Sequence, residues 1–433
     1  MRHRHQGTGR RPWVGLALGV LLACGGGGST PPPPPPPSYP TALSRAQGVA
    51  QGLLASATRD GQGLRWRVVG SDFGAEPLDL YDGSPGTLVF LARLHHADPT
   101  PDLQAALAAG GQWLRAKEGA WSYGKGLFEG RAGFLWAYLG LYEALGDAGW
   151  LDSARATAAA LEADDGSLRG DLISGVPGQG MAFLKLYALT GETRWRDAAR
   201  TKGDLILASA VPVGAGLKVP SFQLPDGRTV FYPGLSHGTA GAAFFLARLS
   251  RALGTPDGDA YRSGALQMAR WLQDRALPNG SEGLTWYRRE PDQLDQLQAT
   301  WCHGAPGICI AFAELYDLTG DAVLLAVATK AAWTVEQTAG EGGFACRCHG
   351  LSGNAEAFLK LYRVTGDPAW KAKAEAFGEQ VWGMRLPGGT TPRWTSGDGS
   401  GQSQSGLMTG QAGMGDFYLE LHSGGQLGMP VTD

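Results

Sequence analysis

Two short segments of this sequence bring together side chains that bind soft or borderline metal ions. The first reads Trp-Cys-His-Gly-Ala-Pro-Gly over 301–307, and the second reads Cys-His-Gly-Leu-Ser-Gly over 348–353. Cys302, Cys348 and His349 offer two thiolates and one imidazole, a donor set typical of zinc. Because three protein ligands leave one tetrahedral position open for a substrate, the pattern favours a catalytic site.

Two thiolate ligands also restrict the chemistry. They neutralise Zn²⁺, so a substrate thiolate bound there stays electron-rich and nucleophilic, whereas bound water would be less acidic than at a three-histidine site. The pattern therefore favours reactions of thiols over hydrolysis. The alternative is a closed structural zinc site in which Cys346 is the fourth ligand. Otherwise we expect Cys309 and Cys346 to be buried thiols or, in an exported protein, a disulfide.

An internal repeat indicates which elements position these residues. A Gly-x-x-Gly pattern recurs seven times, and most copies precede an apolar run of helical length, such as 134–142 or 308–316. In five copies another Gly follows sixteen residues after the first, where a helix would end. The seven copies begin at Gly83, Gly130, Gly175, Gly238, Gly304, Gly350 and Gly410.

Amphipathic segments between the copies, such as 193–209 and 322–338, predict an outer helix for each repeat. We therefore predict an all-α fold, an α/α toroid in which seven helical hairpins form a double-layered barrel, with short β-hairpin insertions. Closure into a ring follows from the lack of polar capping faces on the terminal repeats. The segments that we expect to form loops and small hairpins are 64–69, 218–232, 282–289 and 393–404.

Further polar residues stand in fixed register with the glycines. His237 and His303 directly precede their Gly-x-x-Gly patterns, as His349 does, and imidazoles titrate near neutral pH. Asp171 and Asp79 each lie four residues before a first Gly. Either aspartate is a candidate for acid–base work, and the alternative for each is a carboxylate that stabilises a helix N-terminus.

These motifs, with Leu-Ser-His-Gly-Thr-Ala-Gly over 235–241, resemble the lanthionine synthetase C-like family across residues 41–433. The resemblance implies an α/α toroid with a catalytic zinc. Bacterial members add cysteine thiols to dehydroalanine or dehydrobutyrine in peptides, and eukaryotic relatives resemble glutathione-transferring versions. We therefore expect an enzyme that forms thioethers and whose partner is a thiol-containing peptide or a small thiol. The zinc ligands that the resemblance implies are Cys302, Cys348 and His349.

The resemblance also assigns acid–base roles. It implies that His237 protonates the enolate formed when sulfur adds to the alkene and that Asp171 assists deprotonation of the thiol. Two departures point away from a lantibiotic-type substrate. Gln298 stands where the bacterial cyclases carry Arg, so the positive charge is missing there. His303 replaces their Tyr, as in the eukaryotic branch, and we include it among the catalytic candidates.

The N-terminus predicts export. Residues 1–23 combine a basic segment with an apolar stretch too short to span a bilayer, and Leu-Leu-Ala before Cys24 resembles a bacterial lipobox. We expect lipidation of Cys24, a Gly/Ser/Pro-rich tether over 24–40 and a folded domain over 41–433. The predicted protein is thus an exported bacterial lipoprotein, periplasmic or anchored to the outer membrane, which contacts the membrane through its lipid only. The alternative is an ordinary signal peptide.

Composition limits the remaining classes of function. The net charge is -3 and no basic stripe occurs, which excludes a nucleic-acid-binding protein. The expected oligomeric state is a monomer. Two other functions stay open. One is a non-catalytic zinc lipoprotein that captures thiols or modified peptides, and the other is a carbohydrate-active α/α barrel with paired carboxylates.

Overall fold

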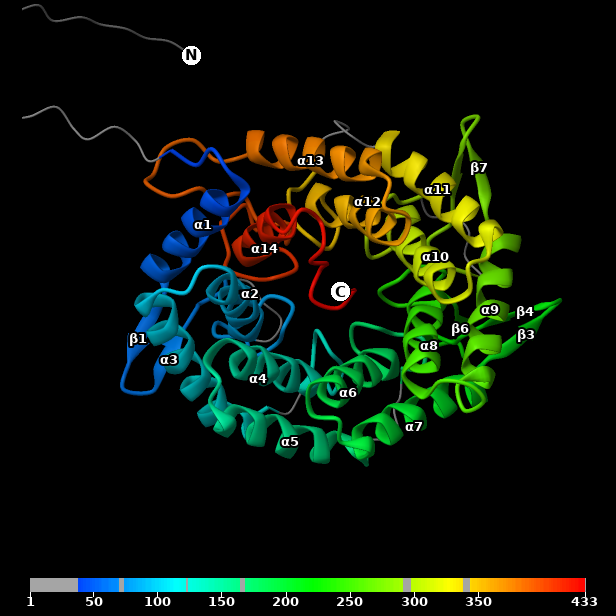
Figure 1. Ribbon diagram of the computed structural model, residues 1–433, viewed down its shortest axis with the longest axis horizontal. Helices are drawn as coiled ribbons and strands as arrows, with labels where there is room; N and C mark the ends of the chain where they lie inside the picture. Colours follow the sequence, from blue (N-terminus) through cyan, green and yellow to red (C-terminus); the bar gives the residue numbers. More distant parts are fainter. Residues whose placement is uncertain are drawn as a thin grey trace, which may run out of the picture. The chain divides into compact units, whose positions relative to one another are not determined.

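The computed structural model describes one helical unit that begins at Ser38. The expected signal peptide, Cys24 and most of the tether lie outside the described residues. In the described part of the chain, fourteen α-helices alternate between an inner and an outer layer of a ring (Figure 1), and none of them is long and apolar enough to cross a bilayer. The described residues are 38–69, 74–121, 124–163, 168–290, 297–337 and 343–432.

Each of the seven inner helices begins directly after the first glycine of a Gly-x-x-Gly pattern. The inner helices pack side by side around a central lumen, and the last of them packs against the first. They are α2 (Ser84–Ala97), α4 (Arg131–Leu145), α6 (Val176–Thr190), α8 (Thr239–Leu253), α10 (Ala305–Thr319), α12 (Leu351–Thr365) and α14 (Gln411–His422).

Six inner helices pack against the outer helix that follows them, and α14 packs against the one that opens the unit, α1. The seventh hairpin is therefore made from both ends of the chain, which closes the ring. The predicted toroid of seven hairpins is confirmed. The outer helices are α1 (Ala42–Ser56), α3 (Pro101–Glu118), α5 (Ala148–Glu162), α7 (Thr193–Ser209), α9 (Asp259–Asp274), α11 (Ala322–Gln337) and α13 (Pro368–Gly383).

A belt of backbone hydrogen bonds joins the repeats at the N-terminal ends of the inner helices. The residue two positions before each first Gly donates its N–H to the carbonyl of its counterpart in the next repeat, over 2.8 to 3.3 Å. The last counterpart, Met408, donates to Tyr81 and so completes the circle. In order of donation the belt runs Tyr81, Phe128, Ile173, Ser236, Cys302, Cys348 and Met408.

Glycine is required where the inner helices crowd at this belt. A Cβ on Gly307 would lie 2.2 Å from the carbonyl oxygen of Trp301 and 2.6 Å from Cβ of Leu235. The predicted terminal glycines are also confirmed, because Gly146 adopts φ 67° and ends α4 in the left-handed conformation. The ends of α6, α10 and α12 are built in the same way.

Short hairpins were predicted, and the described part of the chain contains four two-stranded antiparallel ones. The predicted segment 218–232 contains one of them, and the predicted segments 64–69 and 282–289 each overlap the second strand of another. The hairpin over 211–218 lies almost wholly outside the predicted segments. The fourth predicted segment, 393–404, is a loop, because its backbone bonds Ser396 to Gln402 and Gly397 to Thr409 and pairs with no neighbouring strand. The hairpins pair β1 (Thr58–Asp60) with β2 (Gly63–Arg65), β3 (Val211–Val213) with β4 (Gly216–Lys218), β5 (Phe222–Gln223) with β6 (Thr229–Val230), and β7 (Leu277–Asn279) with β8 (Gly283–Thr285).

Candidate metal and acid–base site

The residue directly before each first Gly is polar in all seven repeats, and six of the seven are half-buried. The belt residues just behind them are mostly buried. The same turn thus presents one polar side chain per repeat at the N-terminal mouth, with three imidazoles on consecutive repeats and two carboxylates on consecutive repeats. These residues are Asp82, Glu129, Ser174, His237, His303, His349 and Thr409.

The two predicted zinc thiols meet at this mouth, although they are forty-six positions apart in the sequence. The backbone of Cys302 donates to Cys348 over 3.1 Å, and their thiols are hydrogen bonded to each other. The hydrogen bond from Cys348 lowers the pKa of Cys302 to about 7, against the effect of burial. That same bond, with burial, raises the pKa of Cys348. Cys302 is therefore the more acidic thiol of a pair whose two sulfurs share a hydrogen bond.

The third predicted ligand, His349, follows Cys348 and is oriented by a distant loop. Its Nε2 donates to the carbonyl oxygen of Gly397 over 2.5 Å, whereas its Nδ1 makes no hydrogen bond to any described residue. Metal-binding histidines commonly donate one ring N–H to a carbonyl in this way and bind metal through the other nitrogen. A Cβ on Gly397 would lie 2.9 Å from Nε2 and 2.4 Å from the sulfur of Cys346, so glycine makes this contact possible.

Across the described residues, no three His, Cys, Asp or Glu side chains are already arranged as a metal cage. The donor chemistry nevertheless fits zinc. Cys302 and Cys348 are in contact, only 6% exposed each, and share a hydrogen bond whose proton a metal would displace. His349, with its Nε2 fixed by a carbonyl, is the residue adjacent to one of them.

His237 and Asp171, predicted to share the acid–base work, form a hydrogen-bonded pair. Nδ1 of His237 lies 2.8 Å from Oδ2 of Asp171, whose Oδ1 accepts from the backbone N–H groups of Ile173 and Ser174, each over 2.8 Å. Burial disfavours a charged imidazole, but Asp171, helped by Glu129, outweighs it, so the pKa of His237 is raised. The imidazolium is therefore a proton donor whose Nε2 is directed away from Asp171.

His303 packs against His237, with ring centroids 5.2 Å apart, and against Tyr232, with centroids 5.1 Å apart. Burial, together with the charges of His237 and Arg288, lowers the pKa of His303 to about 3. His303 is thus neutral beside His237, whose pKa is raised. Its buried Nδ1 has no hydrogen-bond partner among the described residues, so it can accept a bond from a ligand.

The other residues weighed in the sequence lie apart from this chemistry. Asp79 accepts a bond from the backbone of Asp82 over 2.7 Å, as Asp171 does from Ser174, but its Oδ2 has no hydrogen-bond partner among the described residues where that of Asp171 has His237. The possible disulfide between Cys309 and Cys346 is wrong, because both are free, buried thiols. Burial raises the pKa of Cys346 to about 12, so this thiol stays neutral.

Sequence reasoning missed four residues at the mouth. Tyr81 donates a hydrogen bond to the sulfur of Cys348. Asp82 accepts one from Thr409, and burial raises the pKa of Asp82 to about 6. Glu129 accepts from Ser174 over 2.6 Å, and Arg288 lies near enough to His303 to lower its pKa. The register one position before each first Gly, applied to every repeat, would have found Asp82 and Glu129.

Comparisons with known proteins agree with this architecture. A family model described as lanthionine synthetase C-like protein matches residues 74–432. The structure is similar to nisin cyclase, with a TM-score of 0.64 and 19% identity over 82% of this chain and 90% of that chain. It is also similar to a family 76 glycoside hydrolase (mannosidase) from Bacteroides thetaiotaomicron VPI-5482, with a TM-score of 0.54 and 14% identity over 88% of this chain and 97% of that chain. These structural likenesses show the fold alone. A sequence search of curated proteins finds no match.

Proposed function

Because the chain belongs to the lanthionine synthetase C-like family, we propose that it is a zinc-dependent enzyme that adds a thiol to an electron-poor alkene. The favoured acceptor is a dehydroamino acid in a peptide, and the favoured donor is a thiol-containing peptide or a small thiol. The observation that carries this proposal is the contact between Cys302 and Cys348 at the mouth that also holds the His237–Asp171 pair.

In this proposal Cys302, Cys348 and Nδ1 of His349 hold the zinc. When bound, zinc would act as a Lewis acid that keeps the donor sulfur deprotonated and nucleophilic at neutral pH. Gly397 keeps the imidazole of His349 in the tautomer whose Nδ1 is free, since its carbonyl accepts the Nε2 proton.

The proton balance of the addition falls to the His237–Asp171 pair. The donor sulfur forms a bond to Cβ of the alkene, and the π-electron pair moves to Cα and the adjoining carbonyl. Nε2 of the His237 imidazolium delivers its proton to Cα, and the proton that the thiol loses then restores the imidazolium. Asp171 holds Nδ1 and favours the protonated form from which this donation starts. Neutral His303, beside the pair, is suited to accept a hydrogen bond from the substrate.

The second candidate function is carbohydrate chemistry, which the neighbouring carboxylates of Asp82 and Glu129 favour. Burial raises the pKa of Asp82 to about 6, and such a group can act as a general acid. This function leaves the cysteine pair and the three imidazoles without a role, so it ranks second. Sugar release from mannan or other glycans by the purified protein, unaffected by Cys302→Ala, would support it over thiol addition.

The test begins with the metal content of the purified wild-type protein. We expect about one zinc per chain, and loss of zinc in Cys302→Ala and Cys348→Ala. A dehydroalanine peptide incubated with glutathione or cysteine should gain the mass of the thiol, as read by mass spectrometry. Zinc without turnover would favour a non-catalytic protein that captures thiols or modified peptides, and a wild type without zinc would refute the proposal.

We also propose that the chain is exported and anchored through Cys24, which rests on the sequence of residues 1–24 alone. Metabolic labelling with a fatty acid in a bacterial host should label the full-length protein and leave Cys24→Ala unlabelled. Labelling that survives this substitution, or a protein found only in the cytosol, would contradict the proposed anchor.

A further inference from the structure

The position three residues before each first Gly holds an apolar residue in six of the seven repeats and an arginine, Arg347, in the other. The residue three positions before each first Gly points away from solvent and has 0% exposure in every repeat. Five of these residues are Leu and one is Trp, as the packing of inner helices requires, but the repeat that carries Cys348 has an arginine. In order they are Leu80, Leu127, Leu172, Leu235, Trp301, Arg347 and Leu407.

Arg347 is paired inside the ring through both terminal nitrogens of its guanidinium, whereas its Nε has no hydrogen-bond partner among the described residues. Its Nη1 donates to the backbone carbonyl of Ser352 over 3.1 Å, and its Nη2 donates to Oδ2 of Asp416 over 3.0 Å and also to Glu420. Asp416 and Glu420 lie on α14, the neighbouring inner helix, and both are 0% exposed. The guanidinium also sits 5.3 Å above the ring of Phe417.

Stability alone does not explain an arginine at this position. Desolvating a guanidinium and two carboxylates costs about as much as their attraction returns, and apolar replacements of buried ion pairs are often neutral or stabilising. The six other repeats use apolar residues at the same place. What distinguishes this repeat is its location, because Arg347 stands between Cys346 and Cys348, one residue before the first of two adjacent ligands of the proposed zinc site.

We propose that Arg347 is a positioning residue that fastens the ligand-bearing segment 345–349 to α14, so that Cys348 and His349 face Cys302. This inference rests on the proposed metal site. The belt holds the backbone of the segment, since the N–H groups of Arg347 and Cys348 both donate to the carbonyl of Met408, over 3.0 and 2.9 Å. The guanidinium adds three directed bonds on the lumen side. Together they restrict the segment from rotating about the belt.

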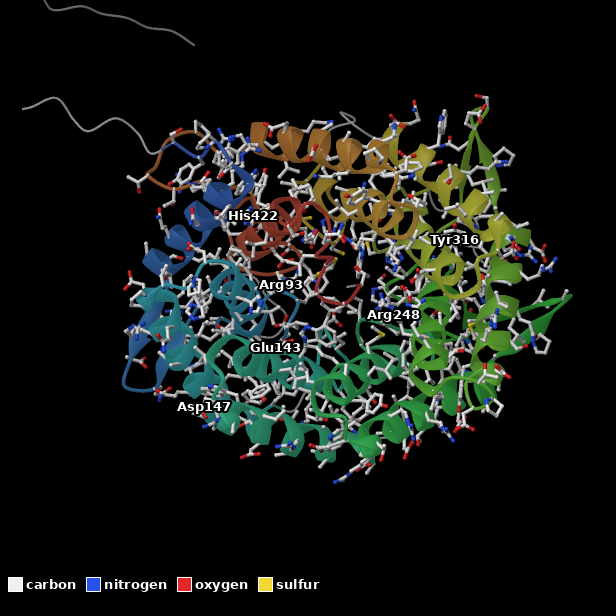
Figure 2. The ribbon with its side chains drawn as sticks, viewed as in Figure 1. Arg93, Glu143, Asp147, Arg248, Tyr316 and His422 are labelled. Carbon is white, nitrogen blue, oxygen red and sulfur yellow. The ribbon has the colours of Figure 1, made fainter. Side chains whose placement is uncertain are left out.

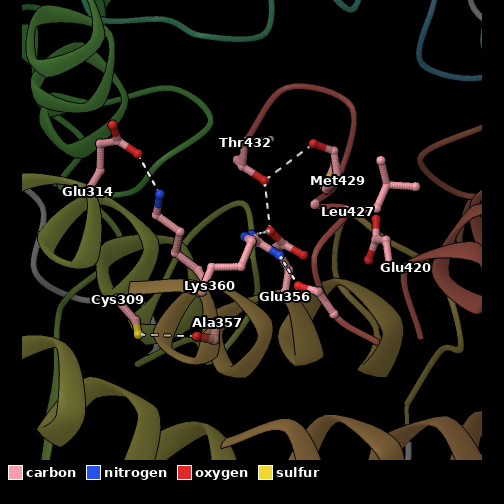
Figure 3. A network of polar contacts seen from close by, with 12 residues as sticks. Cys309, Glu314, Glu356, Ala357, Lys360, Glu420, Leu427, Met429 and Thr432 are labelled. Atoms are coloured by element: carbon pink, nitrogen blue, oxygen red, sulfur yellow. Dashed lines mark hydrogen bonds and ion pairs between the residues drawn. The ribbon is translucent and has the colours of Figure 1, made fainter. Parts of the chain in front are cut away.

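The lumen offers a matched control. Lys360, 4% exposed on α12, donates to Oε2 of Glu314 over 2.5 Å and belongs to the same buried polar region (Figure 3). If Lys360 is removed, Glu314 keeps Arg248 at 2.7 Å, just as Asp416 keeps Arg93 at 2.9 Å if Arg347 is removed. Lys360 carries no proposed ligand beside it, and it pairs with one carboxylate where Arg347 pairs with two.

The experiment compares Arg347→Leu, Arg347→Lys and Lys360→Leu by zinc affinity in chelator competition and by the visible spectrum of the cobalt-substituted protein. Leucine is the residue that the register normally uses, so Arg347→Leu should fold. It should bind zinc about 10- to 100-fold more weakly, the usual effect of losing a group that orients a ligand, and lose the intensity of tetrahedral cobalt. Arg347→Lys should recover part of the affinity, and Lys360→Leu should match the wild type.

If Arg347→Leu does not fold, the double variant Arg347→Leu/Glu420→Gln replaces it in the experiment. The second substitution removes the negative charge of Glu420, which Arg347→Leu leaves without its partner. A metal-free measurement keeps the inference separate from the proposed function. The rate at which diamide oxidises Cys302 and Cys348 to their mutual disulfide, mapped by mass spectrometry, should fall in Arg347→Leu and stay unchanged in Lys360→Leu. A wild type without zinc would refute the proposed function while this rate still tests Arg347. Wild-type behaviour of the leucine variant in every readout, or equal losses in Lys360→Leu, would overturn the inference.

Discussion

The two ends of the barrel use their polar residues differently. At the N-terminal mouth, His303 has a buried nitrogen without a partner among the described residues, and Cys302 shares a hydrogen bond with Cys348. Toward the opposite end a cavity of about 940 Å³ lies between five inner helices and the last described residues of the chain. Its lining is mostly apolar, as with Trp136 and Met181.

The arginine, lysine and glutamate side chains that line this cavity form ion pairs. Arg93, Glu143, Arg248 and His422 surround the central opening in Figure 2. Arg93 binds Asp416 over 2.9 Å, and Lys185 binds Glu143 over 2.8 Å. The chain's final segment also accepts bonds there, from Arg93 to the carbonyl of Gly428 over 2.5 Å. The helix N-termini thus hold a thiol pair and an imidazole nitrogen open to a ligand, where the macrodipole favours thiolates, while the charges at the other end form ion pairs.

The largest expected difference between the two ends of the barrel is the effect of a substitution on zinc binding. Cys302→Ala should abolish zinc binding and thiol addition together, because one thiolate and one imidazole hold zinc far more weakly than the full set. Met181→Ala, at the opposite cavity, should lower stability by about 2–5 kcal/mol and leave the zinc content unchanged. Metal analysis and thermal melts of both variants check this. A zinc-loaded Cys302→Ala protein would mean that the mouth is not the metal site.

The acid–base pair provides the next largest effect. His237→Asn should keep its zinc and lose about 10²- to 10⁴-fold in the rate of addition, since the enolate would lack its proton donor. Asp171→Asn should act through pH. Asp171 raises the pKa of His237, so the wild type keeps the imidazolium to higher pH, and the alkaline limb of the rate profile should move to lower pH in the variant. An unshifted limb would show that another group donates the proton.

Much of this architecture was readable because glycine marks positions where no side chain fits. The pattern at Gly304 and Gly307 locates a helix start against its neighbours, so the repeat, the ring and the register of Cys302 and His237 all follow from spacing. The resemblance suggested acid–base roles for Asp171 and His237 but not the hydrogen bond between them, and the register of Asp171 alone did not separate it from Asp79.

The remainder depended on contacts between residues far apart in the chain. Gly397 orients His349 from a loop forty-eight positions away, and no local pattern in 393–404 reports that contact. Tyr81 was missed because the belt register holds aromatic and aliphatic residues in other repeats, so a tyrosine there looks like packing. Arg347 looked like part of a cysteine-rich run, and only its burial beside Asp416 showed that it faces the lumen.

The buried carboxylate of Glu314 lies away from the mouth, so its removal should change the stability of the protein and not its chemistry. Burial disfavours ionised Glu314, but Lys360 and Arg248 outweigh it and hold its pKa at about 2. Glu314→Gln should therefore cost about 3–5 kcal/mol at neutral pH, because it leaves buried cations uncompensated, and it should leave zinc affinity unchanged.

The sign of the pH dependence follows from the lowered pKa. The stabilisation by Glu314 is complete above its unfolded pKa of about 4.3 and is lost as pH falls toward 2. Denaturant unfolding at pH 7, 4 and 3 should show the wild type approaching the variant as pH falls. Glu143→Gln, which breaks a partly exposed pair with Lys185, is the control and should cost less than about 1 kcal/mol. If Glu314→Gln and Glu143→Gln lower the free energy of unfolding equally, Glu314 does not have the structural role assigned to it.

The smallest expected effect is that of Tyr81→Phe on zinc affinity, and it tests whether Tyr81 belongs to the metal site or to the packing of the ring. Burial and the neighbouring Cys348 raise the pKa of Tyr81, whose hydroxyl donates to that sulfur. A donated bond stabilises the thiolate form that a metal requires, so Tyr81→Phe should weaken zinc binding by about tenfold, and more at low pH, where protons compete for the sulfur. Chelator competition at pH 8 and pH 6 measures both parts. Tyr138→Phe removes a similarly buried hydroxyl, one that donates to Glu118 over 3.0 Å, and should change stability alone. If Tyr81→Phe changes stability alone, as Tyr138→Phe should, then Tyr81 is a packing residue of the ring. In that case Asp82, and not Tyr81, is the residue that the first repeat contributes to the polar mouth.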